Sequence, residues 1–86
     1  MSHRENAVPL ARLSAGHAGR LVEVQGGRKL TRRLLALGLR MGSEIQVLHH
    51  RGTGMVISHG GTRIALGAGI VEKLRVVPLD KQAAAS

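Results

Sequence analysis

Residues 26–42 read GGRKLTRRLLALGLRMG and predict, in order, a turn, a short amphipathic helix, a helix stop and a second turn. On a helical wheel the leucines of this stretch fall within one apolar arc, while its lysine and most of its arginines fall on the opposite side. We therefore expect the helix to bury Leu30, Leu34 and Leu37 and to present its cations to solvent. Strand-like runs lie on both sides, so this helix is a lone insertion between strands.

The end of this helix is marked by Gly38. A glycine at this position adopts the left-handed conformation that ends a helix, and the following Leu39 then contacts Leu34, as in a Schellman motif. Other glycines are expected to form turns because glycine adopts positive φ without steric cost. The structural turn glycines predicted in this way are Gly27, Gly38, Gly42, Gly60 and Gly61.

Short runs typical of β-strands make up much of the remaining chain. They are residues 21–24, 44–49, 55–58, 63–66 and 74–77. In the second run, Ile45, Val47 and His49 are expected to share one face. Gly60-Gly61 predicts a tight hairpin, and Pro78 is expected to end the last strand. About five short strands with one short helix after the first predict a mainly β fold, a small and strongly bent barrel.

The chain is expected to form one domain. Residues 9–79 make up the folded unit, preceded by a flexible arm over residues 1–8 and followed by a disordered tail over residues 80–86. Single helical turns are expected over residues 9–13, before Gly16 and Gly19 break the chain, and over residues 67–72.

Composition excludes several kinds of site. The chain has 86 residues and no Phe, Trp or Tyr, so its core must be aliphatic, and stacking platforms for single-stranded nucleic acid are excluded. It has no cysteine, which excludes a disulfide framework, thiolate zinc sites and thiol catalysis. Without disulfides or an apolar leader, the chain is expected to be intracellular.

The charge of the chain favours acidic partners. The formal net charge is +8 and the isoelectric point is about 11.8. Such a balance suits nucleic acid, anionic lipid or an acidic protein surface, and charge alone does not choose among them.

A set of motifs along the chain resembles a known family. The motifs are Leu10-x-x-Leu13-x-x-Gly16; Leu21-Val22-Glu23-Val24; Gly26-Gly27-x-x-Leu30-x-x-Arg33-Leu34-x-x-Leu37-Gly38-Leu39-x-x-Gly42; Glu44-Ile45-x-Val47; Gly60-Gly61-x-Arg63-Ile64-Ala65-Leu66-Gly67; and Leu74-Arg75-Val76. Together they resemble ferrous iron transport protein A, the FeoA family, over residues 9–79. The stretch from Arg33 to Gly42 is the most specific part.

The resemblance implies a fold and a role. The fold is an SH3-like barrel, and the role is that of a cytoplasmic accessory to the ferrous-iron membrane transporter FeoB. The protein would then be peripheral to the inner membrane through its partner. Similar domains occur at the C-terminus of iron- or manganese-dependent repressors, which carry a winged-helix DNA-binding domain upstream. Met41 stands where the family usually has proline, so this turn is expected to be less rigid.

The residues argue against an enzyme. The acidic residues are Glu5, Glu23, Glu44, Glu72 and Asp80. None lies beside a histidine at a catalytic spacing, and no close carboxylate pair is visible. No serine has a nucleophile-elbow context, and the short glycine runs lack the lysine and helix of a phosphate-binding loop.

The histidines allow two interpretations. His49 and His50 are adjacent on a predicted strand, so they point to opposite faces and do not chelate one ion together. With His59 they are most simply polar surface residues. The alternative is a weak intermolecular site, in which two copies form a weak homodimer and share imidazoles around a divalent transition metal such as Fe or Zn. No cofactor is expected to be required.

The cations of the predicted helix and turn also allow two interpretations. Arginine and lysine on a helix often form only a solvated face. Here, however, five of the 13 lysines and arginines fall within residues 28–40. The predicted partner-binding residues are Lys29, Arg32, Arg33, Arg40 and Met41.

Two functions remain in competition. In the first, which we favour, the protein is a non-catalytic accessory or regulator of ferrous iron uptake that binds FeoB, without a small-molecule substrate. In the second, it is a small basic nucleic-acid-binding or metal-responsive regulatory domain. The absence of aromatic residues and of a helix that could read the major groove makes nucleic acid the less favoured partner.

Overall fold

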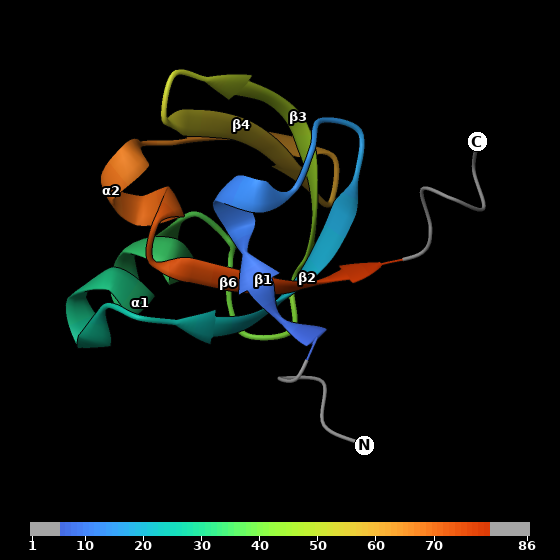
Figure 1. Cartoon of the computed structure of the whole chain (residues 1–86). Helices are drawn as coiled ribbons and strands as arrows, with labels where there is room; N and C mark the ends of the chain where they lie inside the picture. The colour runs from blue at the N-terminus through green and yellow to red at the C-terminus, as the bar shows by residue number, and fades with distance from the viewer. Residues whose placement is uncertain (1–5, 80–86) are drawn as a thin grey trace.

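The computed structural model describes residues 6–79, which form one antiparallel sheet of six strands with two helices and a short 3-10 helix (Figure 1). The strands are β1 (Val8–Pro9), β2 (Ala18–Val24), β3 (Glu44–Arg51), β4 (Gly54–His59), β5 (Thr62–Leu66) and β6 (Leu74–Leu79). The helices are α1 (Gly27–Ala36) and α2 (Ala68–Val71), and the 3-10 helix is η2 (Leu10–Arg12). The order across the sheet is β1-β6-β2-β3-β4-β5, so the last strand lies between the first two.

The expected small barrel of about five strands needs correction in two respects. The described residues form six strands, and no pairing joins the edge strands β1 and β5. The strand missed from the sequence, β1, is only two residues long, which is too short to show alternation. Its Pro9 lacks an N–H group and is therefore suited to an edge strand. The mainly β fold with a helix between β2 and β3 is confirmed.

All five predicted strands extend beyond their predicted ends, and two of them, β2 and β6, also correct an expectation about a particular residue. β2 starts at Ala18, and Gly19 lies inside it instead of breaking the chain. A Cβ atom at Gly19 would lie 2.9 Å from Cγ2 of Val76, so glycine permits a close approach between β2 and β6. β6 continues through Pro78 to Leu79 because it pairs there with β2, where Gly19 lies opposite Pro78 and Ala18 opposite Leu79.

Two irregularities bend the sheet. The register shifts between Leu21 and Glu23 where β2 pairs with β6, and between Val47 and His49 where β3 pairs with β4. Such bulges increase strand twist and bending. The second also corrects an expectation, since Val47 is buried and His49, beyond the bulge, is exposed. His49 therefore does not continue the buried face of β3.

The hairpin between β4 and β5 is as tight as predicted. His59 pairs with Thr62, which leaves Gly60 and Gly61 as the two loop residues. Their φ angles are +57° and +84°, the pair of positive values that defines a type I′ turn. This turn brings the start of β5 directly beside the end of β4.

The core is aliphatic and receives side chains from both helices and most of the strands. Its buried members are Leu10, Leu13, Leu21, Leu30, Leu34, Leu39, Ile45, Val47, Met55, Ile57, Ile64, Leu66, Val71, Leu74 and Val76. Leu37 was expected among them but is 41% exposed. The chain reverses just after Leu37, so Leu39 takes the buried place beside Leu34. No helix of residues 6–79 is long and apolar enough to cross a membrane, α1 with its ten residues being the longest.

Candidate docking surface

Helix α1 begins without the features that usually stabilise a helix start. Its N-cap is Gly26, which provides no side-chain cap, and its first turn contains no acidic residue. Arg28 and Lys29 lie in that turn, where positive charge opposes the helix dipole. A helix selected for stability alone would carry acidic side chains there. The placement of these cations therefore favours a role in binding.

The end of α1 is the predicted Schellman motif. Gly38 has a φ of +88°, and its N–H donates to the Leu35 carbonyl at 2.9 Å. The Leu39 N–H donates to the Leu34 carbonyl at 2.8 Å. These bonds end the helix, leave Leu35 and Leu37 on the surface, and direct Leu39 into the core.

A tight turn follows at residues 40–43. The Ser43 N–H donates to the Arg40 carbonyl at 2.9 Å, and the Arg40 N–H donates to Oγ of Ser43 at 3.0 Å. Gly42 has a φ of +92°, which is typical of the third residue of a type II turn. The turn is joined to β2 by the Gly42 N–H, which donates to the Leu21 carbonyl at 2.7 Å. It leaves Met41 55% exposed.

Two hollows meet at this turn. One, of about 510 Å³, lies between the turn and the start of β3 and includes Leu35 and His59. The other, of about 470 Å³, lies between the turn and β2 and includes Thr31 of α1. Arg40 and Met41 line both.

A larger groove is lined by residues of α1, of α2 and of the segments next to them; the two helices lie on the same side of the molecule in Figure 1. Its volume is about 830 Å³. The apolar part of its lining comes from Leu30, Ala36, Leu37, Ala65 and Ile70. Its charged lining consists of Lys29 and Arg33 from α1 and Lys73 from the segment after α2. We call this the α1–α2 groove.

The structure divides the predicted partner-binding residues among different places. Lys29 and Arg33 line the α1–α2 groove, whereas Arg40 and Met41 line the two hollows at the turn. Arg32 is exposed and lines none of the three. The five residues therefore do not form one depression.

Other groove residues had no signal in the sequence. Ile70 and Lys73 lie about 35 residues after the end of α1, and the chain returns beside α1 only as it leads into β6, which lies between β1 and β2. Leu37 was assigned to the core because the helical wheel gives its direction but not the residue at which the chain turns.

The histidines do not converge. His50 lies opposite Met55 and His49 opposite Val56, so the two side chains lie on opposite faces of β3. His50 Nε2 donates to the Leu13 carbonyl at 2.8 Å, near one end of the β3–β4 hairpin. His59 lies at the other end of that hairpin, about 15 Å away at the usual rise of a strand. Within residues 6–79, no group of three or more metal-ligating side chains is assembled.

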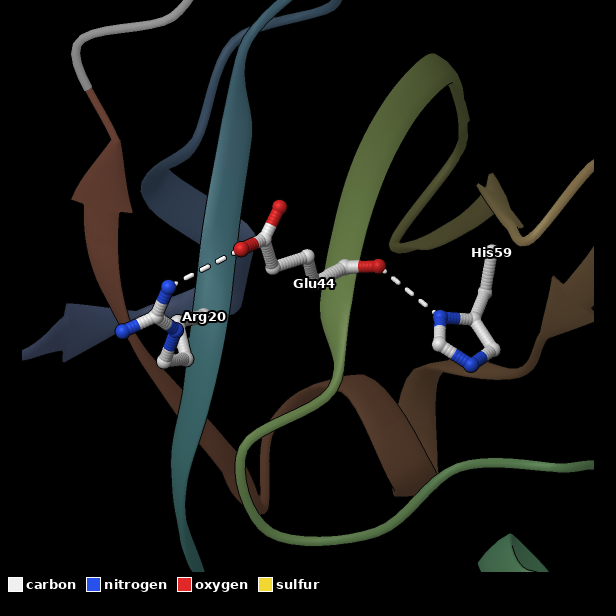
Figure 2. A network of polar contacts seen from close by, with 3 residues as sticks. All are labelled: Arg20, Glu44 and His59. Carbon is white, nitrogen blue, oxygen red and sulfur yellow. Dashed lines mark hydrogen bonds and ion pairs between the residues drawn. The ribbon is translucent and has the colours of Figure 1, made fainter.

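His59 belongs to a polar network that connects three strands (Figure 2). Its Nδ1 donates to the Glu44 carbonyl at 2.9 Å, which ties the end of β4 to the start of β3. Oε2 of Glu44 accepts from Nη2 of Arg20 on β2 at 2.9 Å. Both charged side chains are about 40% exposed, so this pair adds less than about 1 kcal/mol. This network links the three strands β2, β3 and β4 and does not orient a reactive group.

Comparison with known proteins now decides the family. The FeoA domain matches residues 8–78, which is most of the chain. The chain belongs to the FeoA domain family. The match begins and ends within one residue of the unit expected from the sequence, 9–79.

Two similar proteins bear names connected with iron. A protein of Methanocaldococcus jannaschii named "Putative Fe(2+) transport protein A" is 29% identical over 68 residues, which cover 79% of this chain and 83% of that one. The crystal structure of an iron uptake regulatory protein, also a FeoA, is 36% identical with a TM-score of 0.78 and covers 85% of this chain and 99% of its own.

More distant structures share the fold alone. A manganese-dependent transcriptional repressor is 20% identical with a TM-score of 0.77. The match covers 85% of this chain but only 42% of the repressor, so the FeoA-like unit is one part of that larger chain. The SH3-like fold of the family is thus also found in regulators.

Proposed function

We propose that this FeoA protein is a non-catalytic cytoplasmic accessory of ferrous iron uptake that acts by direct contact with the cytoplasmic part of the transporter FeoB. The observation that carries the proposal is the FeoA domain match over residues 8–78. A relative that covers 79% of this chain is named for Fe(2+) transport. Accessory contact would hold the protein at the inner membrane.

The surface of α1 supports contact with an acidic partner. The helix carries Arg28, Lys29, Arg32 and Arg33 and no acidic residue. None of these side chains has an ion-pair partner among residues 6–79. Leu37, at the C-terminal end of this helix, is an exposed large apolar residue and lines the same groove as Lys29 and Arg33. Cations beside exposed apolar side chains suit a protein interface.

The test compares two charge reversals of equal size. Arg32→Glu with Arg33→Glu should weaken binding of the purified protein to detergent-solubilised FeoB by about tenfold or more, because cations of the contact become like charges. The matched control, Arg12→Glu with Arg51→Glu, changes two exposed arginines that line none of the three hollows, and should alter binding by less than about twofold. Circular dichroism verifies that both variants are folded. Full binding by the first variant would place the contact elsewhere.

The second candidate function is a basic regulatory domain that binds nucleic acid. The repressor structures with the same fold and the net charge of +8 favour considering it. Phosphate contacts would give a steep fall of affinity for duplex DNA with salt. We expect no such binding at physiological salt, and a steep log–log slope would support this second function instead.

A further inference from the structure

The α1–α2 groove differs from the other surface hollows in combining an apolar base with a cationic border. Leu30 and Ile70 belong to the core or pack against it, and Leu37 adds a side chain that is 41% exposed. Lys29, Arg33 and Lys73 supply three positive charges from two separate segments. An occupant of this groove must therefore offer apolar side chains and negative charge together.

These three cations are not used within the described fold. The ion pairs of residues 6–79 involve other residues, Arg20 with Glu44 and Arg75 with Glu23. No acidic side chain lines the groove, and Glu72, next to Lys73, is exposed outside it. Three exposed cations beside an apolar surface give this part of the protein a positive potential, which favours an acidic occupant.

Two other occupants fit less well. A second copy of this chain has 13 lysines and arginines against five acidic residues, and its Glu23 and Glu44 already have basic partners. A lipid surface is flat on this scale, and it does not fill a concave groove whose base lies between two helices. A helix with an apolar stripe inserts side chains into such a groove while its flanking carboxylates reach the border.

We propose that the α1–α2 groove binds an acidic amphipathic helix of the transporter's cytoplasmic part. This proposal rests on the proposed function and adds the docking site and the chemistry of the segment that occupies it. The apolar stripe of that helix packs on Leu37 and Ile70, and its carboxylates pair with Lys29, Arg33 and Lys73.

Two neighbouring leucines provide a matched test. Leu35 and Leu37 are both exposed at the end of α1, but only Leu37 lines the groove. Leu37→Gln should weaken binding of the full chain to detergent-solubilised FeoB by about tenfold, because an apolar contact at the centre of an interface is lost. Leu35→Gln should change it by less than about twofold. Equal effects of the two variants, or none, would overturn the groove as the site.

The contribution of the groove's cations is tested in the same FeoB-binding assay. Lys73→Glu should weaken binding several-fold and flatten its dependence on salt, because one attractive pair becomes repulsive. Arg12→Glu makes the same charge change outside the groove and should leave the affinity within about twofold. If the Lys73→Glu variant bound FeoB as tightly as the Arg12→Glu variant, that result would contradict the proposal.

The occupant is identified by photo-cross-linking. A photoreactive residue replaces Ala36, which is exposed and lines the groove, and a control replaces Ala11 in η2. In membranes that contain FeoB, the probe at position 36 should form an adduct with an acidic, helical stretch of the transporter. An adduct with lipid or with a second copy of this chain would overturn the stated occupant.

Failure of this inference is distinguishable from failure of the proposed function. If the native chain binds FeoB but the groove variants bind equally well, only the groove is wrong as the site. If the native chain does not bind FeoB at all, the proposed function is wrong and the groove inference falls with it.

Discussion

Gly38 shows how one residue determines both a helix end and the neighbouring core. Its φ of +88° lies in the left-handed region, and its place after α1 directs Leu39 to within hydrogen-bonding distance of Leu34. The sequence identified Gly38 as the residue that ends the helix, and it identified Leu30 and Leu34 as core residues. That Leu39 and not Leu37 is buried could not be predicted, because a helical wheel does not include the chain reversal after the helix.

The first prediction concerns this position. Gly38→Val should lower the free energy of unfolding by about 1–2 kcal/mol, because a β-branched residue is strained at positive φ. A Cβ atom there meets nothing within 4 Å, so the cost comes from the backbone and not from a clash. The control, Gly69→Val in α2, also meets open space but without a positive φ, and should change stability much less. Thermal melts measure both. An unchanged melting temperature for Gly38→Val would refute the cap.

The structure differs from the sequence-based prediction mainly in the shortest strand, β1, and at the bulge in β3. The longer strands, the helix and the Gly60-Gly61 hairpin were predictable from alternation, helical period and turn chemistry. β1 was not, because two residues carry no period and its pairing with β6 joins distant parts of the chain. The bulge in β3 was not predictable either, since Val47 and His49 follow unbroken alternation in the sequence.

The turn at residues 40–43 yields the second prediction. Met41 is the second residue of a type II turn, a position at which proline is common. The Met41 N–H has no acceptor among residues 6–79, so its loss would break no hydrogen bond there. Met41→Pro should therefore stabilise the protein by about 0.4–1 kcal/mol, because the unfolded chain loses freedom. The melting temperature should rise by roughly 2–6 °C for a domain of this size. A lower melting temperature would show that Arg40 or Met41 does not adopt the backbone that proline requires.

The third prediction concerns metal binding by β3 and β4. His50 and His59 each bind a backbone carbonyl at opposite ends of the hairpin, and His49 lies on the other face from His50. Calorimetry with zinc or ferrous ion should therefore show at most weak binding, stronger at high protein concentration if two copies share imidazoles. A tight one-to-one complex of the monomer would contradict this.

At the scale of the whole molecule, the family could be predicted from the spacing of glycines and leucines, but the α1–α2 groove could not. The motif from Arg33 to Gly42 determines a local structure, and local structure is what a sequence pattern shows best. The α1–α2 groove instead depends on Lys73 and Ile70, which reach α1 only through the order of strands in the sheet. The predicted partner-binding residues therefore stay a prediction, and the structure distributes them over more than one hollow.

The central claim, that this protein serves ferrous iron uptake, is tested most directly by the initial rate of radioactive ferrous iron uptake in cells that lack the chain but retain FeoB. We expect the rate to fall on deletion and to recover when the native chain is restored. Recovery should fail with Arg32→Glu and Arg33→Glu at the same protein level. An uptake rate that does not change when the chain is deleted would contradict the account.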